Sequence, residues 1–200
     1  MKDKKKIYES IFKEIKKGFA RIKWLTITNI NYYFRYLISK KKLKFNSIAI
    51  LIPSKQRVDK LYRFIESLIN KTSKLNRIYI LILIDQNERD KIKYFNLVES
   101  LKKKINIILY EKDEKTHNLR NNFLASQIDA DLYFPMNDDV IFTLKNWDLY
   151  IDKIERLIPY NKPYSIWIKS DVKYNYLHCD FPIVNKLWFN RLNYIGNLYL

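Results

Sequence analysis

Residues 131–142 have the sequence DLYFPMNDDVIF, in which an apolar run over residues 132–136 ends at Asn137-Asp138-Asp139. A short apolar run that stops at a polar turn predicts a buried β-strand. We therefore expect Asp138 and Asp139 at the carboxyl end of a strand, where open α/β sheets bind their ligands. The simpler alternative is a solvated turn, because Asn and Asp favour turns in any case.

Two adjacent carboxylates at the end of a buried strand need a positive group nearby. They repel each other, and they lose hydration at a sheet edge unless a positive group lies between them. Mg²⁺ and Mn²⁺ prefer oxygen ligands and commonly bind one or two carboxylates together with substrate phosphates. The pair Asp138-Asp139 therefore predicts a divalent metal site that holds a substrate diphosphate.

Composition indicates one globular domain with an anionic partner. The chain has 200 residues, 48% of them hydrophobic, and a formal net charge of +17. Such a charge is typical of proteins that bind nucleic acid, membrane surfaces or phosphorylated substrates. The single cysteine, Cys179, excludes an internal disulfide and fits a reducing compartment, so we expect a cytoplasmic location.

Glycine is nearly absent, and this excludes some nucleotide-binding motifs. The only glycines are Gly18 and Gly196. Walker loops and dinucleotide fingerprints need several glycines in one turn so that the backbone can approach the phosphates closely. If a nucleotide binds, side chains and a metal ion must hold its phosphates.

Residues 1–46 form a basic segment that precedes the sheet domain. This segment has 14 lysines and arginines against 3 acidic residues, whereas residues 47–200 have 24 against 18. Apolar residues recur at helical spacing between the lysines, so we expect a basic amphipathic helix. The helix could pack on the domain itself, bind an anionic membrane surface through residues 1–44, or act as a nucleic-acid arm. The apolar positions are Ile7, Ile11, Ile15, Phe19 and Ile22.

From Ser47 onward, strand and helix patterns alternate. This alternation predicts an α/β fold with a mostly parallel central sheet and flanking helices over residues 47–200. The predicted strands are 48–52, 78–84, 105–110, 132–136 and 164–168, and the predicted helices cover 58–70, 92–101, 119–128 and 147–157. Tyr62 and Phe123 are expected in the core, and Thr116 is expected to cap the third helix.

Polar side chains follow several of these strands in a fixed order. The order is strand-Pro53-Ser54-x-x-Arg57, strand-Asp85, Leu-Arg120-Asn121, and strand-Asn-Asp138-Asp139. The spacing is 32 residues from Pro53 to Asp85 and 53 from Asp85 to Asp138. This set resembles the nucleotide-sugar-binding half of GT-A glycosyltransferases, in particular the large family 2 type. The resemblance covers about residues 47–200.

The resemblance implies a metal-dependent, inverting sugar transferase whose donor is a nucleotide-diphosphate sugar. Its acceptor would be a growing surface glycan or a lipid-linked saccharide. The loop with Pro53, Ser54 and Arg57 would line the base pocket, and Asp85 would contact the base or ribose. Arg120 and Asn121 would face the nucleotide-sugar.

The acidic pair has implied roles as well. Asp139 would bind Mn²⁺ or Mg²⁺ directly, and Asp138 would face the ribose or sugar and contribute to the metal site.

Simpler roles remain open for these residues. Asp85 could be a strand-end turn residue, and Arg57 could lie on a solvated helix face. Arg120 could simply pair with one of the nearby acids Glu111, Asp113 and Glu114.

The catalytic base is expected near the end of the chain. Sugar transfer needs a carboxylate that accepts the proton of the acceptor hydroxyl. Asp180 is the candidate for this base, and His178 is a candidate additional metal ligand. The alternatives are a turn acid and a partly buried imidazole. The segment over residues 178–196 is similar to the one that returns beneath the sugar site in the family, but the acidic segment that usually follows is missing before Leu200.

Two other function classes compete with an active transferase. A catalytically degenerate or truncated transferase-like module would bind a donor without completing transfer. A basic nucleic-acid-binding protein would fit the charge and the 16% aromatic content, but no zinc, RNA-recognition or helix-turn-helix signature supports it. We therefore expect a cytoplasmic transferase, and attachment to the cytoplasmic membrane face is one of the three roles open to its basic segment.

Overall fold

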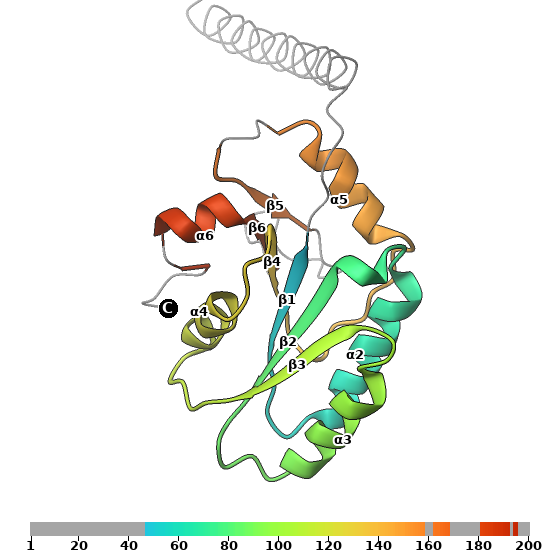
Figure 1. Cartoon of the computed structure of the whole chain (residues 1–200), viewed down its shortest axis with the longest axis vertical. Helices are drawn as coiled ribbons and strands as arrows, with labels where there is room; N and C mark the ends of the chain where they lie inside the picture. The colour runs from blue at the N-terminus through green and yellow to red at the C-terminus, as the bar shows by residue number, and fades with distance from the viewer. Residues whose placement is uncertain (1–46, 159–161, 169–180, 193, 196–200) are drawn as a thin grey trace, which may run out of the picture. The chain divides into compact units, whose positions relative to one another are not determined.

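The computed structural model describes residues 47–158, 162–168, 181–192, 194 and 195. These residues form strands and helices that alternate along most of the chain (Figure 1). The elements are β1 (Ile48–Pro53), α2 (Val58–Lys71), the 3-10 turn η1 (Leu75–Arg77), β2 (Ile78–Ile84), α3 (Lys91–Leu101), β3 (Asn106–Glu111), α4 (His117–Ser126), β4 (Leu132–Pro135), α5 (Trp147–Glu155), β5 (Ser165–Trp167), β6 (Pro182–Asn185) and α6 (Lys186–Leu192).

The described strands form one six-stranded sheet in the order β3-β2-β1-β4-β6-β5. Strands β3, β2, β1 and β4 run parallel, with Ile48 opposite Ile78 on one side and Leu132 on the other. Strand β6 runs antiparallel to β4 and to β5. The carboxyl ends of β1, β2 and β4 therefore meet at the same edge of the sheet.

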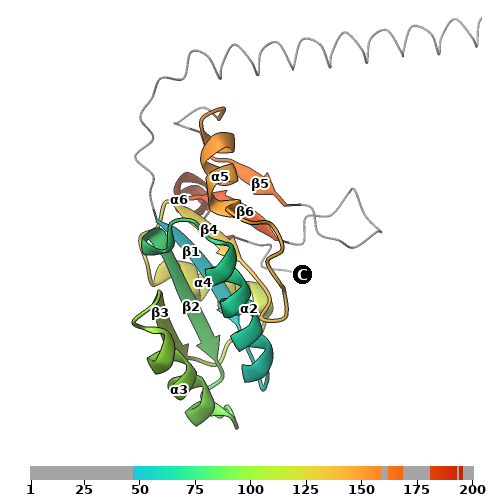
Figure 2. The ribbon, with the colours of Figure 1, turned by 90° about the vertical axis from the view of Figure 1, so that its right-hand side faces the viewer.

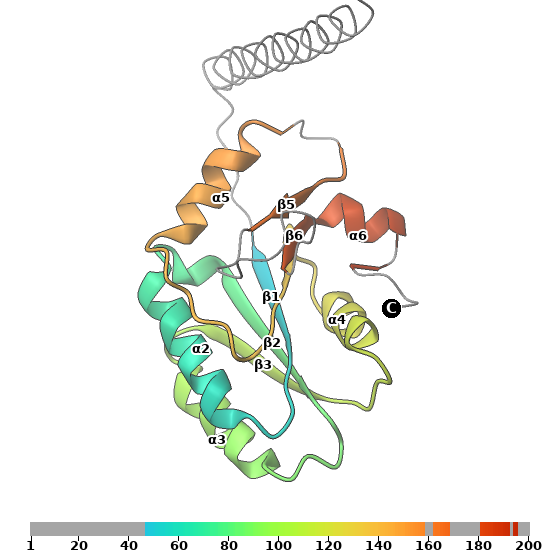
Figure 3. The same cartoon turned by 180° about the vertical axis from the view of Figure 1, so that it is seen from behind.

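Helices cover both faces of this sheet (Figures 2 and 3). Alternate residues of each strand point to opposite faces, so the buried parallel strands supply two apolar layers. One layer contains Ile50, Ile80 and Phe134 and packs against α2, α3 and α5. The other contains Leu51 and Leu83 and packs against α4 and α6. Burial on both faces explains why the strands are continuous apolar runs.

The predicted fold class is confirmed, and the predicted strands and helices end within a few residues of the observed ones. Strand β6 and helix α6 were not predicted as separate elements. Their sequence, PIVN followed by KLWFNRL, is too short for either periodicity to be distinctive.

The prediction for Tyr62 was wrong. Its side chain is 42% exposed, because the buried stripe of α2 runs through Leu61, Phe64, Ile65 and Leu68, and Tyr62 lies beside this stripe. The Tyr62 hydroxyl instead donates to Glu66.

A buried ionic network lies where the chain enters β2, at the end of the sheet opposite to Asp138. Arg77 Nη1 donates to Asp152 Oδ1 over 2.8 Å, and Arg77 Nη2 donates to Asp148 Oδ2 over 3.2 Å. Asp148 also accepts the backbone N–H groups of Ser73 and Lys74. These contacts fasten α5 to the segment that joins α2 to β2.

Within the described ranges, no helix is long and apolar enough to cross a membrane. The predicted basic helix over residues 1–46 lies outside those ranges.

Candidate functional site

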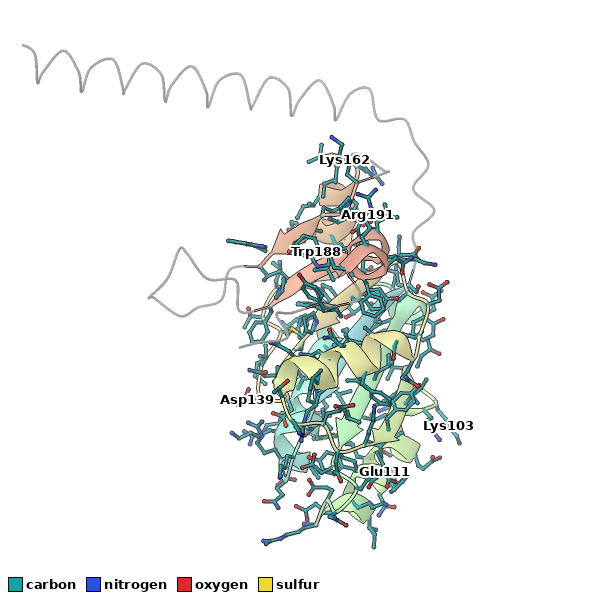
Figure 4. The ribbon with its side chains drawn as sticks, turned by 90° about the vertical axis from the view of Figure 1, so that its left-hand side faces the viewer. Lys103, Glu111, Asp139, Lys162, Trp188 and Arg191 are labelled. Carbon is teal, nitrogen blue, oxygen red and sulfur yellow. The ribbon has the colours of Figure 1, made fainter. Side chains whose placement is uncertain are left out.

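The loop after β1 and the turn after β4 meet at the carboxyl edge of the sheet. Ser54 is 1% exposed and Asp138 is fully buried. Asp138 Oδ2 accepts the Ser54 hydroxyl over 2.6 Å, and Ser54 Oγ lies 2.7 Å from the Tyr94 hydroxyl. Figure 4 shows Asp139 and Glu111 toward this edge of the sheet, far from Lys162 and Arg191. The predicted placement of the acidic pair at a strand end is observed.

The Asp138 carboxylate determines the direction of this hydrogen-bond chain, and Tyr94 lies within the chain. The backbone N–H of Arg57 donates to the Tyr94 hydroxyl over 3.2 Å. An ionised Asp138 can only accept, so Ser54 uses its one proton there, and the proton between Tyr94 and Ser54 must come from Tyr94. The chain therefore runs from Arg57 through Tyr94 and Ser54 to Asp138. Sequence analysis did not single out Tyr94, because it belongs to the apolar stripe of α3 and only its hydroxyl reaches the site.

Arg57 lies across both members of the acidic pair. Its Nη2 is 3.1 Å from Asp138 Oδ1, and its Nη1 is 3.4 Å from Asp139 Oδ2. Lys60 Nζ lies 3.8 Å from the same oxygen of Asp139. The side chains of Arg57 and Asp139 are each 42% exposed, so this cluster opens to solvent beside a buried carboxylate. Arg57 is partly solvated, as the simpler alternative expected. It also contacts both carboxylates, which that alternative did not include.

Burial has the largest effect on the acid–base behaviour of Asp138. Loss of hydration raises the pKa of this carboxyl above its usual value, and the Asp139 charge raises it further. The Ser54 hydrogen bond and the Arg57 charge lower the pKa but do not fully offset these effects. The contacts of Asp138 thus stabilise its negative charge only in part, and a further positive charge nearby would stabilise it more.

Asp85 forms a second charged cluster at the same sheet edge. Its carboxylate lies 2.8 Å from Lys55 Nζ and also contacts the Arg120 guanidinium. Burial raises the pKa of Asp85, but the Lys55 and Arg120 contacts outweigh this effect and hold the pKa below its usual value. Among the described residues, the Arg120 guanidinium pairs with Asp85 and not with Glu111, Asp113 or Glu114, although its Nε donates to the backbone oxygen of Glu114. Two residues that are distant in sequence, Asp85 and Arg120, are thus brought together.

The backbone of the loop after β1 is held in an unusual conformation. Gln56 has a φ of 52°, in the left-handed region that a non-glycine residue adopts at some cost. Its N–H donates to Glu88 Oε2 over 3.2 Å, and the other Glu88 oxygen accepts the N–H of Asp90. Glu88 is 7% exposed, and sequence analysis did not single it out. This contact fixes the loop that carries Arg57.

His117 is a further residue near the acidic pair that sequence analysis did not single out. It is the first residue of α4, directly after the predicted cap Thr116, whose hydroxyl accepts the N–H of Leu119. Burial lowers the pKa of the imidazole, and the charges of Arg120 and Arg57 lower it further, whereas Asp138 raises it. The charges of both clusters thus act on the His117 imidazole. The signal in the sequence that could have identified His117 is its position three residues before Arg120 on the same helix.

The remaining predicted site residues fall into two groups. Pro53 is the buried last residue of β1, and Asn121 is 4% exposed in α4. The Asn121 Oδ1 atom has no hydrogen-bond partner among the described residues. The predicted base Asp180 and the candidate ligand His178 lie outside the described residues.

The acidic pair can be tested for its fit to a divalent metal ion. The buried Asp138 Oδ1 atom makes no hydrogen bond within the described residues, although it lies at ion-pair distance from Arg57. No group of three or more His, Cys, Asp or Glu side chains suitable for a metal occurs in the described part of the chain. Two carboxylates are nevertheless sufficient for Mg²⁺ or Mn²⁺ when substrate phosphates complete the shell. The pair Asp138-Asp139 therefore fits such an ion.

Comparisons with known proteins support the fold. A scan against protein-family models and a search of curated proteins both find no match. A search of solved structures finds a mannosyltransferase, PcManGT from Pyrobaculum calidifontis, in complex with GDP-Man and Mn²⁺. The TM-score is 0.60 at 11% identity, over 84% of this chain and 55% of the other.

A second solved structure is TarS residues 1–349 of S. aureus in complex with UDP. It matches with a TM-score of 0.47 and 11% identity, over 55% of this chain and 32% of that one. This chain thus spans 55% and 32% of the two proteins. The likeness to PcManGT shows that the chain has the α/β fold of that mannosyltransferase.

Proposed function

We propose that this chain is a glycosyltransferase that takes a sugar from a nucleotide-diphosphate donor to an acceptor hydroxyl. The observation that carries the proposal is the convergence of Ser54, Arg57, Asp85, Arg120 and the acidic pair at one sheet edge. Ligands of open α/β sheets bind at this edge. The fold shared with a mannosyltransferase supports the same reading.

The charges at this edge suit a nucleoside diphosphate. Asp85 is held ionised by Lys55 and Arg120, so it is ready to accept hydrogen bonds from a base or ribose. Arg57 and Lys60 provide cationic groups for the phosphates. Asn121, whose Oδ1 has no hydrogen-bond partner within the described ranges, is a candidate contact to the nucleotide-sugar.

We propose that Mn²⁺ or Mg²⁺ is the cofactor and that Asp139 and Asp138 hold it. When bound, such an ion would stabilise the negative charge that develops on the departing diphosphate. The Ser54 hydroxyl orients Asp138 for this role, and Tyr94 orients Ser54. Mn²⁺ accompanies GDP-Man in the PcManGT complex.

The remaining parts of the proposal rest on the sequence. Asp180 is the proposed base for the acceptor hydroxyl, and His178, two residues before it, is the proposed additional metal ligand. We propose a growing surface glycan or lipid-linked saccharide as the acceptor. We further propose that residues 1–44 bind the cytoplasmic membrane face, since their excess of lysine would attract anionic lipids.

Calorimetric titration of the purified chain tests the proposed donor site. The chain is titrated in two buffers, one with Mn²⁺ and one with EDTA. The ligands are UDP, GDP, UDP-GlcNAc and GDP-mannose. Metal-dependent binding of one nucleotide is the expected result. Binding of none of them in either buffer would contradict the proposal.

Turnover separates an active transferase from a degenerate binding module. The donor that binds is incubated with candidate acceptors, and release of the free nucleotide diphosphate is followed for the wild type and for Asp180→Asn. We expect release by the wild type and its loss in the variant, with donor binding retained. Binding without turnover would favour the module.

A further inference from the structure

The guanidinium group of Arg57 occupies the space beside the oxygens that a divalent ion would bind. It lies 3.1 Å from Asp138 Oδ1 and 3.4 Å from Asp139 Oδ2. The other Asp138 oxygen, Oδ2, accepts the Ser54 hydroxyl and is also the end of the Tyr94 hydrogen-bond chain. Asp138 therefore offers Oδ1 to a metal, and that atom faces Arg57.

An ion and this arginine conformation exclude each other. Mg²⁺ binds oxygen at about 2.1 Å, much closer than the guanidinium nitrogens lie, and its two charges would repel the guanidinium at such short range. Arg57 must therefore leave the two carboxylates before a metal can bind both of them. Lys60, at 3.8 Å from Asp139 alone, imposes a weaker constraint.

Only the side chain of Arg57 has to move. Its backbone N–H is fixed by the Tyr94 hydroxyl, and its backbone oxygen accepts the N–H groups of Lys60 and Leu61 at the start of α2. The side chain itself is 42% exposed and can turn without disturbing the core. A planar guanidinium binds phosphate oxygens in the same two-pronged way as carboxylates.

We propose that Arg57 blocks the metal site in the free protein and transfers to the diphosphate of the donor when the donor binds. The metal and the donor then bind strongly only together. This inference rests on the proposed function for its donor half, whereas the blocking of the metal site by Arg57 does not depend on it. Because coupling between two ligands is reciprocal, the donor raises metal affinity by the factor by which the metal raises donor affinity.

Titration with Mn²⁺ alone tests the blocked site. Free Mn²⁺ is measured by electron paramagnetic resonance in the wild type, in Arg57→Met and in Arg63→Met. Arg63 is an exposed arginine of the same helix, so its replacement removes the same charge without freeing the acidic pair. We expect Arg57→Met to bind Mn²⁺ about 10-fold more tightly than the wild type, within the usual range of coupling between sites. Arg63→Met should behave like the wild type.

A double variant locates the effect. Adding Asp139→Asn to Arg57→Met should abolish the gain in Mn²⁺ affinity. Equal Mn²⁺ affinity of the wild type and Arg57→Met, or an equal gain in Arg63→Met, would overturn the inference. Circular dichroism checks the fold of each variant, and Arg57→Gln replaces Arg57→Met under the same criteria if the latter does not fold.

Nucleotide titrations keep this inference separate from the proposed function. If no variant binds UDP or GDP, the proposed donor site is wrong, while the Mn²⁺ result still decides whether Arg57 blocks the metal site. If the wild type binds a nucleotide with Mn²⁺ but Arg57→Met shows no gain for Mn²⁺ alone, the donor site stands and the inference is wrong.

Discussion

Tyr94 and Asp138 are joined through a single hydroxyl, that of Ser54, with distances of 2.7 Å to the Tyr94 oxygen and 2.6 Å to Asp138 Oδ2. A phenol in the core stripe of α3 thereby orients a buried carboxylate at the end of β4. The same phenol accepts the backbone N–H of Arg57. One side chain thus fixes both the carboxylate and the loop that carries its cationic partner.

Replacing Tyr94 with phenylalanine removes only this hydroxyl. We expect the free energy of unfolding to fall by about 1–2 kcal/mol, because the Arg57 N–H and the Ser54 hydroxyl each lose a partner. Urea denaturation measures the change. Nucleotide affinity should also fall, since the acidic pair and the loop lose their orientation. Tyr150→Phe, at a half-exposed position on α5, is the matched control. An unchanged nucleotide affinity in Tyr94→Phe would contradict the positioning role.

Asp139→Ala should abolish the metal dependence of donor binding and leave the fold intact. The side chain is 42% exposed, so the free energy of unfolding should change by about 0.5 kcal/mol or less. Calorimetry with and without Mn²⁺ gives the first quantity, and urea denaturation gives the second. Asp59→Ala removes an exposed acid from the first turn of α2 and serves as the control. Retained metal dependence in Asp139→Ala would show that the ion binds elsewhere.

The pH dependence of stability should report the Asp85 ion pairs. Because the folded protein holds the pKa of Asp85 below its usual value, this carboxylate stabilises the fold at neutral pH, and the contribution is lost as the pH falls below about 4. The stability advantage of the wild type over Asp85→Asn should therefore shrink between pH 6 and pH 3. Urea denaturation at the two pH values measures it.

For Asp138→Asn we expect the stability difference from the wild type to change with pH in the opposite direction. Burial raises the pKa of Asp138 in the folded protein, so its contribution is present in acid and is lost as the pH rises through that raised pKa. The stability of the wild type relative to Asp138→Asn should therefore decrease from pH 3 to pH 6. Parallel changes in the two variants would show that the pH dependence arises elsewhere.

Arg77→Met should destabilise the fold strongly and leave the candidate site unchanged. It leaves the buried Asp148 and Asp152 carboxylates without their guanidinium, which typically costs about 3–5 kcal/mol. Chemical denaturation measures the loss, and Arg63→Met at an exposed position is the control. Nucleotide affinity under folding conditions should match the wild type, because the network lies at the opposite end of the sheet. A small change in stability would show that the two acids find other partners.

Deletion of residues 1–40 should weaken binding to vesicles that contain anionic lipid. The deleted segment has most of the excess positive charge of the first 46 residues. Co-sedimentation with vesicles of phosphatidylserine and phosphatidylcholine measures binding, and pure phosphatidylcholine is the control. Equal binding by the two forms would reject a membrane role for this segment.

Much of the fold could be predicted because the parallel strands are buried on both faces. Continuous apolar runs such as Ile78–Ile84 end at polar residues, and this places Asp85 and the acidic pair at one edge without knowledge of the tertiary structure. The side-chain contacts at this edge could not be predicted in the same way, because they join residues that are far apart in the sequence. Asp85 pairs with Arg120 across 35 positions, and Ser54 binds Asp138 across 84, so no local pattern links them.

Tyr94 and Glu88, which hold the site through contacts distant in sequence, were the hardest residues to find in the sequence. Tyr94 follows the apolar spacing of its helix, and Glu88 lies in a polar turn where an exposed acid is expected. Each was missed because its role depends on a loop contributed by another strand.

The position of β4 within the sheet matters before the chain is complete. On one side β4 pairs with β1, but its other neighbour is β6, which follows α5 and β5 in the sequence. During synthesis β4 is an open edge until Pro182–Asn185 has left the ribosome, a delay of roughly several seconds at ordinary translation rates. An apolar edge with unpaired backbone groups invites pairing with another chain. During this interval β4 is open to pairing with a strand of another chain.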